Sequence, residues 1–320
     1  MVWIVALGLM AAPAQAGLPT EAPIPSSMPL SPTPTIEHIE IVVGDLRFDA
    51  LAAAPETGDL VLLLHGFPQT GHSYRAQIAA LAEAGYRAVA PDQRGYSPGA
   101  RPTRVEDYVM GNLVADAVGM VDALGYERFH LVGHDWGGAV AWVVATRFPG
   151  RVRTLTVLST PHFGALGAGL SDPDSEQSQR SSYFDTFAAE GSEALFLADD
   201  KAFFRSILEG VEIPEADLNV YLERLGTPEA MRAALNWYSA LVAGRTGATG
   251  GASPPPPPIQ MPTLYVWGSE DVAFAREAAE ATREFVAGPY SFHALEGRGH
   301  WLPEEAAETV TRLILEHLSS

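Results

Sequence analysis

Short apolar strands alternate with helical patterns from Thr35 onward. Residues 36–43 and 46–53 are two strand-like segments on either side of a turn at Gly44-Asp45, which predicts an antiparallel strand pair. Residues 60–64 read LVLLL, a pattern typical of a strand buried on both faces. Further strands are predicted at 86–90, 129–132, 152–158, 263–267 and 290–295, and helices at 73–84, 105–124, 139–147, 273–285 and 304–318. This alternation is typical of an α/β fold, in which helices cover both faces of a mostly parallel sheet.

The section from 163 to 241 has a different pattern, with amphipathic helical stretches and no convincing strand. The clearest of these stretches are 182–189, 200–208 and 228–241. An all-helical insertion between two strands predicts a cap over the carboxyl ends of the sheet, where open α/β sheets place their sites. Residues 243–258, AGRTGATGGASPPPPP, predict a flexible Gly-rich piece followed by a stiff run of five prolines.

The predicted domain organisation is a core formed by 35–162 and 259–320, interrupted by the helical cap and its return linker at 163–258. Residues 1–16, MVWIVALGLMAAPAQA, fit a secretory signal peptide that ends at a small-x-small site, although no Lys or Arg precedes the apolar run. The Pro-rich residues 17–34 predict an extended linker. We therefore expect export to the periplasm or medium, and a cytoplasmic protein if the first segment is not a signal.

The amino-acid composition limits the classes of partner and cofactor that the chain is expected to bind. The 320 residues include 20 Lys and Arg against 39 Asp and Glu, a net charge of −19 that disfavours binding to nucleic acid or anionic lipid. The absence of cysteine excludes disulfides, thiolate metal sites and cysteine nucleophiles. The chain also lacks a P-loop, a dinucleotide-binding fingerprint and a zinc-type histidine cluster, so we expect no cofactor and no metal. Oligomeric state is left open.

The strongest chemical motif is Gly133-His134-Asp135-Trp136-Gly137, which links an apolar strand to a helix. It matches the small-x-nucleophile-x-small pattern of a nucleophile elbow, with aspartate in the place that serine occupies in ester hydrolases. Glycines flank the nucleophile because the turn is sharp and a side chain there would collide with neighbouring backbone. Asp135 is the predicted nucleophile, and an ester hydrolase is disfavoured because this residue is not serine.

Two partners follow in the chain order nucleophile, acid, histidine, which is the order of α/β-hydrolases. Asp271 follows a buried strand, and His300 lies in the Gly-rich loop after the last strand. Glu270 is adjacent to Asp271 and is an alternative for the acid. Phe67 follows another buried strand, where an oxyanion loop belongs, so the backbone N–H groups of Phe67 and Trp136 are the predicted oxyanion donors.

The motifs HGFPQT (65–70), DQRGYS (92–97), GHDWGG (133–138) and GRGHW (297–301) resemble the epoxide hydrolase branch of the α/β-hydrolase superfamily. The resemblance runs from about residue 36 to the C-terminus and is strongest in the core. It implies an α/β-hydrolase fold and two cap tyrosines that hydrogen-bond the epoxide oxygen, matched here by Tyr183 and Tyr238, although a neighbour could replace Tyr183. It also implies a hydrophobic epoxide as substrate, opened by Asp135 to an ester that His300-activated water hydrolyses to a vicinal diol.

Other functions remain open at this stage. A haloalkane or haloacetate dehalogenase shares the Asp, His and acid, but Phe67 stands where the haloalkane type usually has Asn, and the Arg typical of the haloacetate type does not follow Asp135. A non-catalytic binding protein on the same scaffold would be expected to lose a member of the triad, and none is missing.

Overall fold

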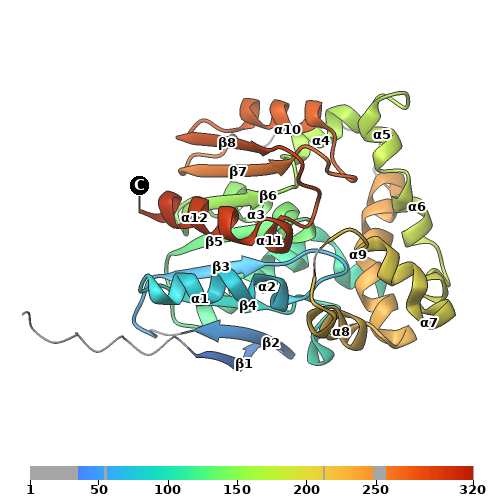
Figure 1. The fold of residues 1–320 in the computed structure, drawn as a ribbon, viewed down its shortest axis with the longest axis horizontal. Helices are drawn as coiled ribbons and strands as arrows, with labels where there is room; N and C mark the ends of the chain where they lie inside the picture. The colour runs from blue at the N-terminus through green and yellow to red at the C-terminus, as the bar shows by residue number, and fades with distance from the viewer. Residues whose placement is uncertain (1–34, 54–55, 212, 248–256, 320) are drawn as a thin grey trace, which may run out of the picture. The chain divides into compact units, whose positions relative to one another are not determined.

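The predicted strands pair edge to edge into one sheet through backbone hydrogen bonds, and the apolar faces of this sheet are buried against helices. A computed structural model describes residues 35–53, 56–211, 213–247 and 257–319 (Figure 1). In this part of the chain an eight-stranded sheet has the order β1-β2-β4-β3-β5-β6-β7-β8. The first two neighbouring pairs, β1 with β2 and β2 with β4, are antiparallel, and the other pairs are parallel. The strands are β1 (Ile36–Val43), β2 (Leu46–Ala53), β3 (Leu60–Leu64), β4 (Arg87–Pro91), β5 (Phe129–His134), β6 (Val152–Leu158), β7 (Thr263–Gly268) and β8 (Tyr290–Leu295).

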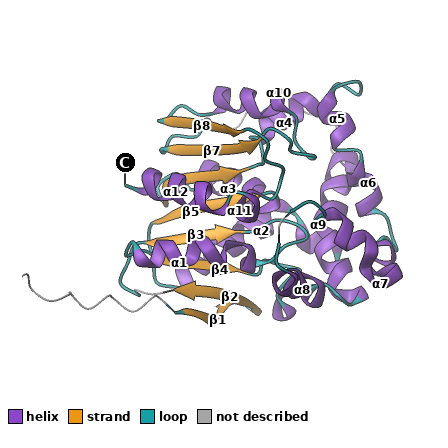
Figure 2. Cartoon of the chain, viewed as in Figure 1, coloured by secondary structure: helices purple, strands orange, loops and turns teal. Residues whose placement is uncertain are grey.

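Helices form a layer on each face of this sheet (Figure 2). Ile78 and Leu81 of α1 join Leu313 and Ile314 of α12 in an apolar layer on one face, and α2 and α3 supply the layer on the other face. The core helices are α1 (Arg75–Glu83), α2 (Met110–Ala123), α3 (Trp136–Arg147), α10 (Arg276–Ala281), α11 (Leu302–Glu305) and α12 (Ala307–Leu318). This arrangement is the predicted α/β architecture.

The predicted insertion contains helices joined by turns, with no strand among its described residues, and lies beyond the carboxyl ends of the strands (Figure 1). Its apolar side chains, such as Phe184 and Phe196, belong to the same buried cluster as the α2 and α3 face of the core. The helices are α4 (Phe163–Leu170), α5 (Glu176–Arg180), α6 (Tyr183–Ala188), α7 (Glu193–Ile207), α8 (Glu215–Arg224) and α9 (Pro228–Gly247). Of these, α4 packs against α10 of the core.

Several predicted boundaries were wrong. Helix α9 continues through Gly247, where the sequence had predicted a flexible piece from 243. Two glycines cost a helix only about 1 kcal/mol each, which does not end one that is already packed against η3 (Val105–Tyr108). Helix α3 begins at Trp136 rather than at 139, because the strand turns into the helix without a loop.

Four other predicted helices begin or end differently. The first opens with a 3-10 turn, η1 (Gly71–Tyr74), the second divides into η3 and α2, and the last divides at Ala306 into α11 and α12. The helix predicted at 273–285 begins at Arg276 and ends in a 3-10 turn, η4 (Thr282–Phe285), because residues 271–275 form a loop around the Asp271 carboxylate.

The predicted signal peptide at 1–16, the linker at 17–34 and most of the proline run lie outside the described residues. Among the described helices, none combines the length and apolar character needed to span a bilayer.

Candidate active site

Asp135 occupies a strained turn between β5 and α3. Its backbone has φ 51° and ψ −120°, in the region of φ that side chains rarely adopt. The flanking glycines are required by space, since a Cβ on Gly133 would collide with the carbonyl oxygen of Gly137, and a Cβ on Gly137 with that of Leu64. The predicted elbow is therefore present, and it places the Asp135 carboxylate at the carboxyl edge of the sheet.

Two backbone amides approach the Asp135 carboxylate. The N–H of Phe67, from the loop after β3, donates to Oδ1 of Asp135 at 2.8 Å. The N–H of Trp136 is also a hydrogen-bonding partner of this carboxylate, because α3 begins directly after Asp135 and leaves its first amides free. Both predicted oxyanion donors thus lie beside the predicted nucleophile.

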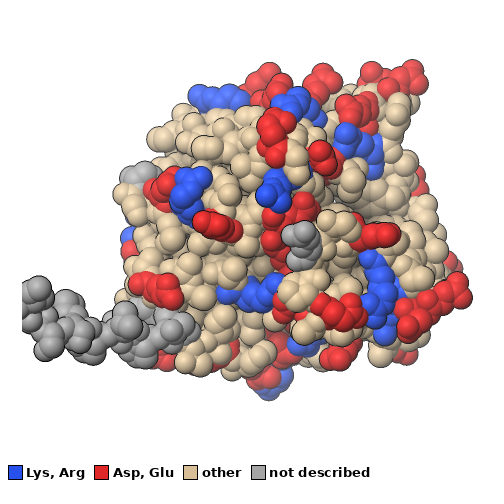
Figure 3. All heavy atoms as spheres, viewed as in Figure 1, with Lys and Arg blue, Asp and Glu red and all other residues tan. Residues whose placement is uncertain are grey.

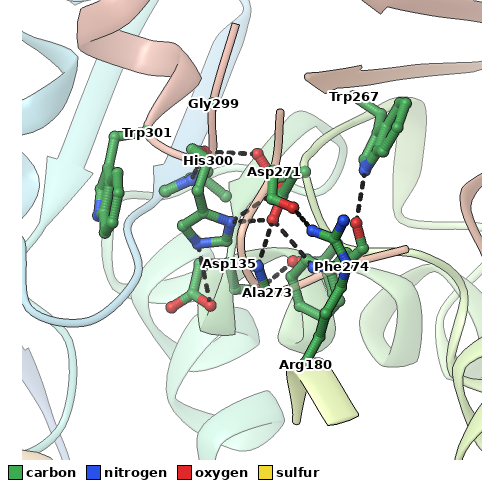
Figure 4. A network of polar contacts seen from close by, with 12 residues as sticks. Asp135, Arg180, Trp267, Asp271, Ala273, Phe274, Gly299, His300 and Trp301 are labelled. Carbon is green, nitrogen blue, oxygen red and sulfur yellow. Dashed lines mark hydrogen bonds and ion pairs between the residues drawn. The ribbon is translucent and has the colours of Figure 1, made fainter. Parts of the chain in front are cut away.

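His300 lies between the two predicted carboxylates (Figure 4). Its Nε2 is 3.5 Å from Oδ2 of Asp135, and its Nδ1 is 3.0 Å from Oδ2 of Asp271. Asp271 is fully buried, and its Oδ1 accepts the backbone N–H groups of Ala273 and Phe274 at 2.8 and 2.9 Å. Glu270 is exposed, so of the two acids left open by the sequence it is Asp271 that contacts the histidine.

The charges of this group depend on one another. Burial alone would lower the pKa of His300, but the carboxylates of Asp271 and Asp135 outweigh burial and raise it to about 10. Burial likewise opposes ionisation of Asp135, yet the hydrogen bond and charge of His300 hold the Asp135 pKa below its usual range. The resting state at neutral pH is therefore an ionised Asp135 beside a protonated His300.

The two predicted cap tyrosines lie together and line the cavity that also contains Asp135 and His300. Tyr183, at the start of α6, and Tyr238, on α9, have ring centroids 6.0 Å apart and are hydrogen-bonding partners. Burial raises the pKa of both phenols well above the ordinary value, and the charge of Asp135 adds to this shift. Both hydroxyls therefore stay protonated and can donate hydrogen bonds.

Two cavities meet at Asp135 and Tyr183. One, of about 400 Å³, also contains Tyr238 and His300, and its polar side chains Ser206 and Glu209 lie on or just after α7. The other, of about 320 Å³, is almost entirely apolar; its lining residues include Trp136, Val143, Phe163, Leu166, Phe184 and Leu241. The arrangement suits a mainly apolar small molecule whose reactive carbon faces the Asp135 carboxylate.

Some supporting residues were not found by sequence reasoning. The backbone carbonyl of His300 accepts from Nε2 of His134 at 2.8 Å and from Oγ of Ser159 at 2.6 Å. The hydroxyl of Thr160 donates to the carbonyl of Asp135 at 2.8 Å. Ser159 and Thr160 follow directly after β6. This position at the carboxyl edge of the sheet is the feature from which they could have been predicted to lie near the site. Among the described residues, no three His, Asp or Glu side chains converge in a way that could hold a metal ion.

Comparison with known proteins identifies the family of this chain. Residues 59–307 match the model of the alpha/beta hydrolase fold family. The chain is 32% identical to AB hydrolase superfamily protein YfhM of Bacillus subtilis, over 84% of this chain and 93% of that protein. It is also 32% identical to epoxide hydrolase A of Mycobacterium tuberculosis, over 86% and 94% of the two chains.

A solved structure shares the architecture. It comes from a study of novel epoxide hydrolases from metagenomes of hot environments, with a TM-score of 0.79 and 27% identity, covering 89% of this chain and 99% of that one. This chain therefore belongs to the alpha/beta hydrolase fold family, in its epoxide hydrolase branch.

Proposed function

We propose that this protein hydrolyses epoxides to vicinal diols through a covalent ester on Asp135. The observation that carries the proposal is the pair of phenol donors, Tyr183 and Tyr238, in the cavity that also contains Asp135 and His300. Similarity to proteins named as epoxide hydrolases supports the same activity. The substrate is an apolar epoxide, because the cavities at Asp135 are lined mainly by apolar side chains.

In the first half-reaction an oxygen of Asp135 attacks an epoxide carbon, and the bond from that carbon to the epoxide oxygen breaks. The leaving alkoxide is a strong base, and it takes a proton from the hydroxyl of Tyr183 or Tyr238. Formation of the ester removes the negative charge of Asp135, so the pKa of His300 falls. His300 then releases its proton, which restores the neutral phenol.

In the second half-reaction neutral His300, oriented by Asp271, takes a proton from a water molecule that attacks the ester carbonyl. The oxyanion that forms accepts hydrogen bonds from the N–H groups of Phe67 and Trp136, and one such donor is worth about 3 kcal/mol in other hydrolases. Collapse breaks the bond between the carbonyl carbon and the alcohol oxygen. The carboxylic proton passes to the departing alkoxide, which leaves ionised Asp135, protonated His300 and free diol.

A dehalogenase would use the same triad but would need N–H donors to hold a halide, which leaves without a proton. The Trp136 indole lies next to Asp135 and could serve, but it is already a hydrogen-bonding partner of the Tyr238 hydroxyl. The phenols, which suit an alkoxide, thus support epoxide opening over halide release.

The test compares diol formation from styrene oxide with bromide release from a bromoalkane by the same protein. Diol without bromide is the expected result. Tyr238→Phe removes one donor and should slow diol formation by about tenfold to a hundredfold, with Tyr183 compensating in part. The double change with Tyr183→Phe should slow it far more than either change alone. Bromide release without diol, or a double variant as active as the parent, would contradict the proposal.

A further inference from the structure

The loop that presents His300 is held by the carboxylate of Glu305, the last residue of α11. One oxygen of Glu305 accepts the N–H of Gly299 at 2.7 Å, and the other accepts the N–H of Trp301 at 2.8 Å. These are the two backbone amides that flank His300 along the chain (Figure 4). Because the acceptor is a carboxylate group, both hydrogen bonds belong to the stronger, charge-assisted class.

The rest of the loop leaves His300 little freedom to move. Its carbonyl oxygen is held from the core side by His134 and Ser159. Gly299 lies against Gly268 of β7, where a Cβ on Gly268 would collide with the Gly299 carbonyl oxygen. A Cβ on Gly299 would lie 3.0 Å from both carboxylate oxygens of Glu305. The Glu305 carboxylate and the Gly299 backbone are thus in direct packing contact as well as hydrogen-bonded.

We propose that Glu305 is a positioning residue for His300, and that it supports hydrolysis of the ester intermediate rather than its formation. The inference rests on the proposed function. His300 releases its proton only after Asp135 has attacked the epoxide, so a small displacement of its ring leaves the attack itself nearly unchanged. Water activation instead requires Nε2 to hold one water in line with the ester carbonyl, and rates of such steps fall steeply with misplacement.

Three variants test the proposal. Glu305→Gln keeps the shape of the side chain but replaces one acceptor oxygen with an NH₂ group, which cannot accept from a backbone amide. Gly299→Ala perturbs the same contact from the opposite side, through the added Cβ. Glu308→Gln is the matched control, because it removes the same charge from an exposed position three residues further along the chain.

Single-turnover experiments with styrene oxide separate the two half-reactions, with the ester followed by intact-protein mass and the diol by chromatography. We expect Glu305→Gln and Gly299→Ala to form the ester at the rate of the parent and to hydrolyse it more slowly, on the order of tenfold. The ester should therefore accumulate in both, while Glu308→Gln behaves as the parent does. Melting temperatures measured in parallel report any general loss of stability.

The outcomes are distinct. Equal slowing of both half-reactions, or hydrolysis at the parent rate in either folded variant, overturns the positioning role of Glu305. A parent protein that forms neither ester nor diol overturns the proposed function itself, which is a different result. If Glu305→Gln fails to fold, Gly299→Ala decides the question, because it retains the carboxylate and displaces it.

Discussion

At the scale of single residues, the site combines backbone strain with buried charge. Asp135 and Ser159 have φ values of 51° and 68°, and a non-glycine residue in this region costs about 1–3 kcal/mol. Both strained residues lie at the candidate site: Asp135 is the predicted nucleophile, and the hydroxyl of Ser159 donates to the carbonyl oxygen of His300. The close approach of backbone at Gly133 and Gly137 shows that tight packing surrounds the Asp135 turn.

Replacement of the histidine should separate the two half-reactions. His300→Gln is expected to leave attack by Asp135 possible and to block ester hydrolysis, because glutamine cannot take a proton from water. A covalent adduct on Asp135 should then accumulate and appear as an increase in protein mass after incubation with an epoxide. Asp135→Ala should form no adduct. Turnover of the His300 variant at the parent rate would mean that His300 is not the base.

The pH dependence of stability should report the buried ion pairs. The pKa of His300 is raised from 6.5 to about 10 in the folded state, so its contribution to stability is complete below pH ~6.5 and is lost as the pH rises toward 10. The difference in unfolding free energy between parent and His300→Gln should therefore shrink from pH 6.5 to pH 10. Urea unfolding at several pH values measures it. A difference that does not change with pH would contradict the raised pKa.

At the scale of elements, α8 provides a polar anchor between cap and core. Asp217 pairs with Arg75 at 2.7 Å, the hydroxyl of Tyr221 donates to Oε1 of Glu304 at 3.0 Å, and Arg224 pairs with Asp49 at 2.7 Å. Asp217, Tyr221 and Arg224 share one helical face, because they are spaced by four and three residues. Since Glu304 and Glu305 are adjacent on α11, one short helix contacts both the cap and the His300 loop.

The anchor should contribute measurably to stability. Tyr221→Phe removes one buried hydrogen bond to Glu304, and we expect it to lower the unfolding free energy by about 1 kcal/mol. Tyr126→Phe is the control, since the Tyr126 hydroxyl donates to the carbonyl of Glu56 at an exposed site. Urea unfolding should show little effect for the control. Equal effects of the two changes would argue against a special contribution from α8.

At the scale of the whole molecule, acidic side chains exceed basic ones, and the net charge is −19. On the face shown in Figure 3 the acidic groups are interspersed with basic ones rather than gathered into one patch. Several basic groups are engaged in ion pairs, such as those of Arg94 with Asp116 and Arg151 with Asp122. An excess of negative charge favours solubility and gives no attraction to polyanions.

We also propose that the protein is exported. The apolar run in residues 1–16 ends at Ala14-Gln15-Ala16, a small-x-small site of the kind that signal peptidases cleave. The mature chain should then begin near Gly17, and N-terminal sequencing of protein from a host that exports it would reveal this end. Recovery of intact Met1 from the soluble cytoplasm would contradict the proposal.

The sequence by itself determined the α/β fold and the main chemical groups. Strand and helix patterns are local, because burial of one face imposes a period of two or of 3.6 residues, and β3 could be assigned from five apolar residues alone. Asp135 and His300 could also be predicted from local sequence, since the patterns of a nucleophile elbow and of a tight histidine loop both place glycines next to the candidate residue.

The tertiary structure decided what depends on residues far apart in the chain. Asp271 rather than Glu270 contacts His300 because only Asp271 points inward from the loop after β7. The 6.0 Å separation of Tyr183 and Tyr238 follows from the packing of α6 on α9. The support of His300 by Glu305 has no periodic or compositional signature, because a hydrogen bond from a backbone amide to a side chain depends on the path of the loop and not on the residue types within it.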